Sequence, residues 1–239
     1  MPKVAVVIPA RWGSTRFPGK PLIDLKGKSM IQRVYEGACA SEVLSEVFVA
    51  TDDERIYSHV EEFGGQVRMT SKEHTTGTDR CGELAQTLEA DVIINIQGDE
   101  PLVNHQQLDA LCAAFTNPRV EIATLGISMK DDLSYLHDPN RIKIAVDAFG
   151  QALYFSRSSI PFERVENDYP FLRHIGLYAF RRETLLKLIQ LAPCKLEQTE
   201  SLEQLRWLYY GHKIQVVETN IETPNIDSPE DVEKVLRLL

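Results

Sequence analysis

Short runs of apolar, β-branched residues alternate along the chain with segments whose apolar residues recur at helical spacing. The runs are typical of buried strands, and the spaced segments of helices with one apolar face. Strand–helix alternation on this scale predicts a mostly parallel sheet with helices on both faces. In the first half of the chain we predict strands over 3–10, 46–53, 65–71, 91–100 and 121–128, and helices over 30–41, 54–64, 79–90 and 104–115.

The alternation changes after residue 130. Residues 141–162 read as two strands around a turn at Ala148–Gly150, which predicts an antiparallel hairpin. We therefore predict one Rossmann-like α/β domain over residues 1–239, with a smaller β-containing insertion at about 130–175. The remaining predicted elements are a strand followed by a helix over 173–192, a helix over 201–212, a strand over 213–219 and a helix over 228–239.

Composition narrows the class of protein. A hydrophobic content of 43% and a charged content of 26% describe an ordinary globular chain. A net charge of −9 argues against nucleic-acid binding, which needs a basic surface, and no apolar run is long enough to span a membrane. The four cysteines form no CxxC pair, so we expect neither a disulfide framework nor a zinc site, and we expect a reducing, cytoplasmic location.

Polar and charged residues follow three of the predicted strands directly. They are Pro9–Arg11, Ala50–Asp53 and Gln97–Glu100. In open α/β sheets, ligands bind beyond the carboxyl ends of the strands. We therefore expect these three clusters to meet at one edge of the sheet.

The loop "IPARWGSTRFPGKPL" at residues 8–22 follows the first strand and does not have the Walker A spacing. Its glycines allow close backbone approach, while Arg11, Arg16 and Lys20 supply charges that can neutralise phosphate oxygens. A surface loop with solvated cations is the alternative. We interpret the loop as a site for a nucleoside triphosphate.

Two aspartates are candidate metal ligands. Asp99 follows the apolar run "VIINIQG", and Asp227 lies in "NIDSPED", between the last strand and the last helix. Nucleotide-bound Mg²⁺ is usually held by one or two carboxylates together with phosphate oxygens. A turn or a helix cap is the alternative for each residue.

Segments along nearly the whole chain resemble one known family, the 3-deoxy-manno-octulosonate (Kdo) cytidylyltransferases, also called CMP-Kdo synthetases. The loop and the "NIQGDEPL" segment are shared with other sugar nucleotidyltransferases, whereas the FSR, RHIG and LEQLR segments point to this branch. The matching segments are "IPARWGSTRFPGKPL", "VATDDERI", "GTDR", "NIQGDEPL", "ALYFSRSSIPF", "RHIGLYAFR", "LEQLRWLYYGHKI" and "DSPEDVE".

The resemblance implies transfer of CMP from CTP to Kdo, giving CMP-Kdo and pyrophosphate for lipopolysaccharide biosynthesis. It implies in-line attack of the sugar 2-hydroxyl on the α-phosphate, with Mg²⁺ as cofactor. It also implies a homodimer to which the insertion contributes.

The resemblance also assigns roles by position. Nucleotide-binding positions are Arg11, Ser14, Arg16, Lys20, Thr76, Gly77 and Arg80. Sugar-binding positions are Gln97, Arg157, His174, Tyr178, Glu203 and Gln204, with Arg157 facing the sugar carboxylate. The metal-binding carboxylates are Asp99 and Asp227, which with Lys20 form the catalytic set. The other acids of residues 195–206 are expected to face water.

Three departures from the family pattern stand out. Residues 75–78 read Thr-Thr-Gly-Thr where Pro/Gln-Ser-Gly-Thr is common, and Asn225-Ile226 replaces Gly-Val before the second aspartate. The segment between Pro161 and His174 is short. Two alternatives stay open. The substrate is the 8-amino analogue of Kdo or another acidic sugar, or the chain is a nucleotide-binding regulator without catalysis. An NAD-linked dehydrogenase ranks last, because the glycine fingerprint of that class is absent from the sequence.

Overall fold

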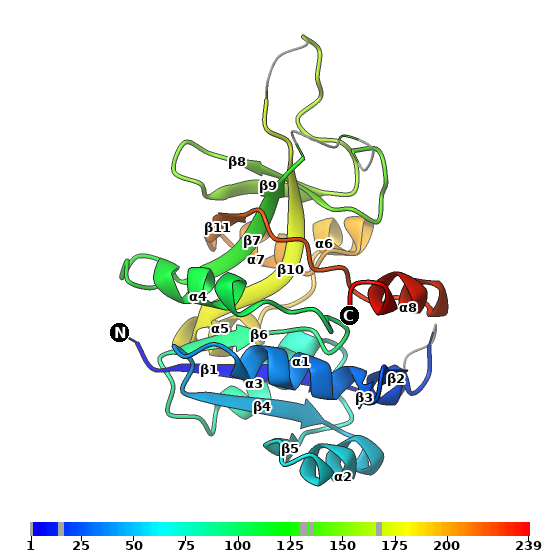
Figure 1. Ribbon diagram of the computed structural model, residues 1–239. Helices are drawn as coiled ribbons and strands as arrows, with labels where there is room; N and C mark the ends of the chain where they lie inside the picture. Colours follow the sequence, from blue (N-terminus) through cyan, green and yellow to red (C-terminus); the bar gives the residue numbers. More distant parts are fainter. Residues whose placement is uncertain (1, 14–16, 130–132, 134–135, 166–168) are drawn as a thin grey trace.

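The computed structural model describes residues 2–13, 17–129, 133, 136–165 and 169–239 (Figure 1). Within these residues a nine-stranded sheet runs through the molecule. Its strands are β1 (Val4–Ala10), β4 (Glu46–Thr51), β5 (Val67–Met69), β6 (Val92–Asn95), β7 (Ile122–Ser128), β8 (Lys143–Val146), β9 (Ala152–Ser156), β10 (Leu172–Arg181) and β11 (Ile214–Thr219).

The main sheet has the strand order β11-β7-β10-β6-β1-β4-β5. Neighbouring strands are parallel except at β10, which runs antiparallel to both β6 and β7. This confirms the predicted mostly parallel sheet. The first residue of β10, Leu172, pairs with the last residue of β7, Ser128. The chain thus leaves the sheet at the end of β7 and returns at the same edge, so β10 runs in the opposite direction.

The predicted hairpin is also confirmed. β8 pairs antiparallel with β9, and Gly150 makes the turn between them at a φ of 71°. β8 also pairs with β10, so the hairpin extends the main sheet instead of forming a sheet of its own. In Figure 1 the hairpin lies at the end of the molecule opposite α2 and β5.

Alternate residues of the strands face opposite layers, as the pleat of a strand requires. In β1, Val4, Val6 and Ile8 pack in one apolar cluster, and Ala5 and Val7 in the other. Helices α1, α2 and α4 cover the first face, and α3, α5 and α7 cover the second. The helices are α1 (Met30–Cys39), α2 (Glu54–Glu62), α3 (Gly77–Ala85), α4 (His105–Ala114), α5 (Arg182–Leu188), α6 (Lys195–Glu200), α7 (Gln204–Tyr209) and α8 (Pro229–Leu236).

A separate apolar cluster fixes the last helix. Ile226 and Val235 are fully buried against Leu25 and Met30. Leu25 belongs to the two-stranded ribbon of β2 (Asp24–Leu25) and β3 (Lys28–Ser29), and Met30 directly follows it. A short 3₁₀ turn, η1 (Lys20–Leu22), leads into this ribbon. The cluster therefore brings the segment before α8 against the segment that follows β1.

The segment after α5 departs from prediction, because α6 ends at Ser201 in a left-handed conformation (φ 50°) and α7 begins anew. Two of its acids do not face water as expected. Glu197 pairs with the buried Arg206, and Glu200 accepts hydrogen bonds from the Ser156 hydroxyl and the Arg157 backbone. The acids bind partners that lie elsewhere in the fold, which helical periodicity does not reveal.

Replacing Trp207 with alanine is expected to lower the free energy of unfolding by about 3–5 kcal/mol. The indole of Trp207 is buried against the rings of Tyr178 and Phe180, at centroid distances of 5.0 and 5.2 Å. Denaturant unfolding measures the change. Tyr209→Ala, on the exposed side of the same helix, serves as the control and is expected to change stability by no more than about 0.5 kcal/mol.

Candidate functional site

A cavity of about 200 Å³ opens at the carboxyl ends of β1 and β6. We call it the strand-end cleft. It is lined by Pro9–Arg11, Lys20, Pro21, His74–Gly77, Arg80, Gln97–Asp99 and Asp227. The first and third of the expected strand-end clusters therefore meet here, as predicted.

Close backbone packing makes this convergence possible. A Cβ atom on Gly98 would lie 2.8 Å from the backbone oxygen of Pro9, and one on Gly77 would lie 3.1 Å from the ring of Pro9. Both glycines therefore let the segments after β1 and β6 and the start of α3 approach each other more closely than side chains would allow.

The N-terminus of α3 faces the cleft. Thr76 caps the helix by accepting a hydrogen bond from the Asp79 backbone, and the Asp79 carboxylate accepts one from the Thr76 backbone in return. Gly77, at the first helical position, and Thr76 both line the cleft. The positive end of the helix dipole favours an anion at this place.

Arg80 lines the cleft from the same helix, and its guanidinium binds residues that lie outside the cleft lining. Its guanidinium forms an ion pair with Asp52 at 2.8 Å and also donates to Thr70 and to the Ser71 carbonyl. The middle cluster, Ala50–Asp53, thus supports the cleft from outside it. Asp53 lies away from the lining, where it caps α2 and pairs with Arg55.

Lys20 joins three distant parts of the chain. Its ammonium group donates to Asp99 Oδ2 at 2.7 Å and to the Ile226 carbonyl at 2.8 Å, and the Ile226 N–H donates to the Asp99 carbonyl at 3.0 Å. An ammonium group has three donors, so one N–H of Lys20 is left for a ligand in the cleft. Arg11 also lines the cleft, and its side chain is exposed.

Asp99 and Asp227 line the same cleft although they lie far apart in the sequence. Two carboxylates are a donor set suited to Mg²⁺, which completes its shell with waters and phosphate oxygens. Across the described residues, no group of three or more His, Cys, Asp or Glu side chains could hold a metal. An ion at this place would therefore need oxygen atoms from a nucleotide or from water.

Glu100 is a buried carboxyl group next to this pair; the sequence placed it in the Gln97–Glu100 cluster but gave it no role of its own. Its Oε2 atom has no hydrogen-bond partner among the described residues. Burial, and then the negative charge of Asp99, raises the pKa of Glu100 to about 8, against the opposing effect of Arg173. Glu100 therefore holds its proton at neutral pH when no metal ion is bound.

The predicted sugar-binding residues, apart from Arg157, gather around α3, β10 and α7. Gln97 lines the cleft and donates to Asn95 at 3.1 Å. Glu203 accepts a hydrogen bond from the Thr78 hydroxyl at 2.6 Å, and burial raises its pKa. Gln204, the next residue on α7, is buried.

Two aromatic side chains of β10 extend this group. Burial lowers the pKa of His174 to about 3, so the ring is neutral; its Nε2 lies 2.9 Å from the Thr124 hydroxyl. The ring of Tyr178 lies 5.3 Å from that of His174, and its buried hydroxyl has no hydrogen-bond partner among the described residues. Neutral donors and acceptors of this kind suit sugar hydroxyl groups.

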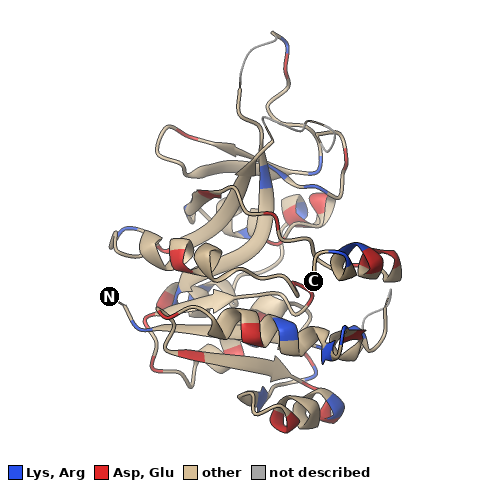
Figure 2. Cartoon of the chain, viewed as in Figure 1, with Lys and Arg blue, Asp and Glu red and all other residues tan. Residues whose placement is uncertain are grey.

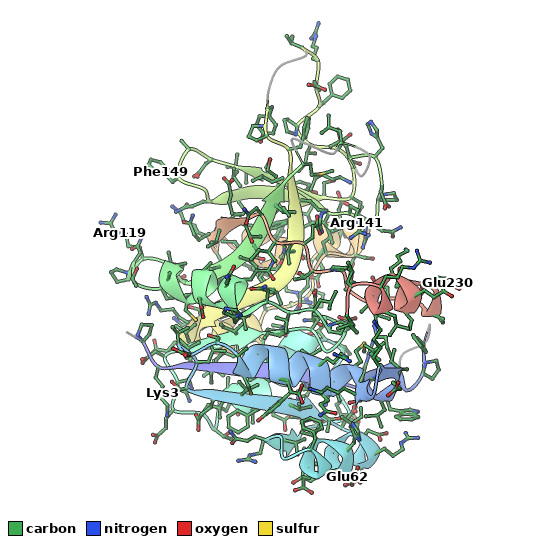
Figure 3. All side chains as sticks on the ribbon, in the orientation of Figure 1. Lys3, Glu62, Arg119, Arg141, Phe149 and Glu230 are labelled. Atoms are coloured by element: carbon green, nitrogen blue, oxygen red, sulfur yellow. The ribbon has the colours of Figure 1, made fainter. Side chains whose placement is uncertain are left out.

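Arg157 does not line the strand-end cleft. Its guanidinium donates to the carbonyls of Glu200 at 2.6 Å, Pro139 at 2.9 Å and Ser201 at 3.4 Å. It lines a second cavity, of about 600 Å³, between the insertion and residues 224–234 (Arg141 and Glu230 are labelled in Figure 3). We call this cavity the α8 cleft. The expected contact between Arg157 and a sugar carboxylate stays a prediction. To bind a carboxylate, the guanidinium would have to give up at least one of its hydrogen bonds to these backbone carbonyls.

Two assigned residues have no described position, and one residue that was not assigned lines the cleft. Ser14 and Arg16 lie outside the described residues. His74 lines the cleft although no sequence pattern pointed to it. It pairs with Glu83, which also accepts a hydrogen bond from the Ser71 backbone at 2.9 Å. Only the position of His74 just before Thr75–Gly77 could have indicated a role.

Charge is concentrated locally and not over a whole face. In Figure 2, acidic and basic residues alternate along α1, α2 and α8. A strand-end cleft that combines cationic side chains, a helix N-terminus and two carboxylates is typical of α/β enzymes that bind and transfer nucleotides.

Comparison with known proteins agrees with this class. Residues 5–214 match the family model described as cytidylyltransferase. A 3-deoxy-manno-octulosonate cytidylyltransferase from Porphyromonas gingivalis is 48% identical over 99% of this chain and 96% of its own. The chain therefore belongs to the cytidylyltransferase family, and within it to the 3-deoxy-manno-octulosonate cytidylyltransferases.

Other relatives refine the comparison. A solved structure of a CMP:2-keto-3-deoxy-manno-octonic acid synthetase complexed with CTP is 43% identical, with a TM-score of 0.95 over 99% of this chain and 98% of that one. An 8-amino-3,8-dideoxy-manno-octulosonate cytidylyltransferase from Shewanella pealeana is 46% identical over 96% of this chain and 95% of its own. In the described part of the chain, no helix has the length and apolar character needed to cross a membrane.

Replacing Glu100 with glutamine is expected to flatten the pH dependence of stability in the presence of EDTA. The carboxyl group keeps its proton up to a pH of about 8 in the folded chain but loses it near its usual pKa of 4.5 in the unfolded chain. Its contribution to the free energy of unfolding is therefore greatest below pH 4.5 and is lost as the pH rises to about 8. Denaturant unfolding at several pH values tests this, and parallel profiles for both proteins would contradict it.

Proposed function

We propose that this chain transfers CMP from CTP to Kdo, releasing pyrophosphate, with attack of the sugar 2-hydroxyl on the α-phosphate. The observation that carries the proposal is the convergence of Lys20, Asp99 and Asp227 on one cleft beside the N-terminus of α3. The relatives that match nearly end to end are named for this sugar. The product supplies lipopolysaccharide biosynthesis.

The phosphate chain of CTP lies against the positive side of the cleft. Arg11 and the remaining N–H of Lys20 bind phosphate oxygens, while the backbone at Thr76–Gly77 offers the helix N-terminus. Arg80 keeps its bond to Asp52 and acts on the nucleotide as a fixed charge. Ser14 and Arg16 remain assigned to the same phosphates through the family pattern.

Asp99 and Asp227 hold Mg²⁺. When bound, the ion would offset the negative charge of the phosphate oxygens as the α-phosphate is attacked. Lys20 neutralises one oxygen of Asp99 and leaves the other carboxylate oxygen for the ion. The two aspartates come from separate segments, so their spacing is set by the contacts of Lys20 with Asp99 and Ile226.

The sugar binds beside Gln97, toward β10 and α7. Glu203 and the neutral ring of His174 face its hydroxyl groups, with Tyr178 and Gln204 beside them. Arg157 binds the sugar carboxylate after releasing a backbone carbonyl, since a guanidinium fits a carboxylate with two parallel hydrogen bonds. The 8-amino analogue of Kdo is the second candidate substrate, favoured by the relative from Shewanella pealeana.

The proposal includes a homodimer in the cytoplasm. Large apolar side chains are exposed on the β8–β9 hairpin and the loop after it: Phe149, Leu153, Phe162 and Val165. Phe149 projects from the hairpin turn in Figure 3. Exposed apolar groups of this kind favour a protein partner. The four cysteines are free thiols, which suits a reducing compartment.

Asp99→Asn is expected to lower kcat by about 10²–10³ while the fold is kept, because the change removes charge from the metal site. Pyrophosphate release with CTP, Mg²⁺ and Kdo measures the effect. Asp53→Asn is the control: this aspartate also follows a strand but lies outside the cleft, and asparagine can still cap α2.

The same assay decides the substrate when it is run over the four nucleoside triphosphates with Kdo, 8-amino-Kdo and neuraminic acid. We expect turnover with CTP and Kdo. Turnover with neuraminic acid alone, or binding of CTP without turnover of any of these sugars, would contradict the proposal.

The combined change Phe149→Ser and Leu153→Ser is expected to convert the dimer to a monomer. Light scattering after size exclusion should give twice the chain mass of 27.1 kDa for the unaltered protein and the single mass for the variant. Leu238→Ser changes an exposed apolar residue at the end of the chain and should leave the dimer intact. A dimeric double variant would place the interface elsewhere.

A further inference from the structure

The backbone on both sides of Asp227 is held in place. Ile226 is fully buried in the apolar cluster under α8, and its two backbone polar groups bind Lys20 and Asp99. On the other side, the Asp227 N–H donates to the Asp231 carboxylate at 3.2 Å, within the capping box of α8. These bonds fix where the Asp227 side chain, which ends in the carboxylate, leaves the backbone.

Asn225 contacts that carboxylate directly. Its amide Nδ2 donates to Asp227 Oδ2 at 2.9 Å. Both residues line the α8 cleft, while Asp227 also lines the strand-end cleft. The amide thus holds one carboxylate oxygen at the boundary between the two cavities.

We infer that Asn225 is a positioning residue that orients the Asp227 carboxylate for Mg²⁺, an inference that rests on the proposed function. Mg²⁺ requires near-ideal octahedral geometry, so the direction of each carboxylate matters for binding. Groups that hydrogen-bond a metal-binding carboxylate restrict its rotation before the ion arrives. The hydrogen bond from Asn225 holds Oδ2 and partly satisfies its charge.

The two aspartates of the site are then oriented by different means. Lys20 binds Asp99 Oδ2 with a full positive charge, whereas Asn225 binds Asp227 Oδ2 with a neutral amide. A second cation at residue 225 would compete with the metal for the same carboxylate. The neutral amide fixes direction with less loss of negative charge, which a divalent cation needs.

Asn225→Ala is expected to weaken Mn²⁺ binding about tenfold, since loss of a group that orients a metal-binding carboxylate costs about 10–100-fold in metal affinity. Mn²⁺ serves as the probe and is titrated by electron paramagnetic resonance, with the enzyme saturated by α,β-methylene-CTP. The free Mg²⁺ concentration that gives half-maximal initial rate should rise by a similar factor.

Asn140→Ala is the matched control, because Asn140 is an exposed asparagine that lines the same α8 cleft. It should leave both readouts unchanged. The inference would be overturned if Asn225→Ala left both the Mn²⁺ affinity and the Mg²⁺ concentration at half-maximal rate unchanged, even if its melting temperature fell. Asp227→Asn tests the proposed metal site separately from the role of Asn225. If this variant binds Mn²⁺ as the unaltered protein does, the metal assignment in the proposed function fails.

Discussion

The ion pair between Lys20 and Asp99, extended to the Ile226 carbonyl, is the contact on which the arrangement of the site depends. It joins the loop after β1, the end of β6 and the segment before α8. Side chains of Lys20 and Asp99 are largely shielded from water, so removing one partner would leave the other charge poorly solvated. The same bonds that give the cleft its shape therefore also set its charge.

The fold follows from the sequence where burial is periodic. The central parallel strands β1, β4 and β6 are buried on both faces because helices cover both sides, and their apolar runs stand out from the helical segments between them. The break between α6 and α7 did not stand out. Ser201 adopts a left-handed conformation that serine rarely favours, and the acids around it bind partners from the insertion and from α7. Tertiary contacts decide such a feature, so local periodicity misses it.

The site was predictable to the extent that sheet geometry brings residues together. Parallel strands end at one edge, so Arg11 and Asp99 were expected to meet. Asp227 was a candidate from its place before the last helix, and the family resemblance assigned it to the same metal site as Asp99. Glu100 was predicted only as a member of a strand-end cluster, and Asn225 only as a departure from the family pattern. Their own roles depend on burial and on one hydrogen bond, neither of which has a sequence signature. Arg157 was assigned by resemblance, yet its donors bind backbone carbonyls.

The burial of Ile226 beneath α8 has a consequence for the order in which the parts of the site can form. Lys20 and the Ile226 carbonyl lie 206 residues apart in the sequence, and closing so long a loop costs conformational entropy. The paired strands of the sheet lie closer together in the sequence. The cleft is therefore complete only once the segment before α8 has packed against Leu25 and Met30.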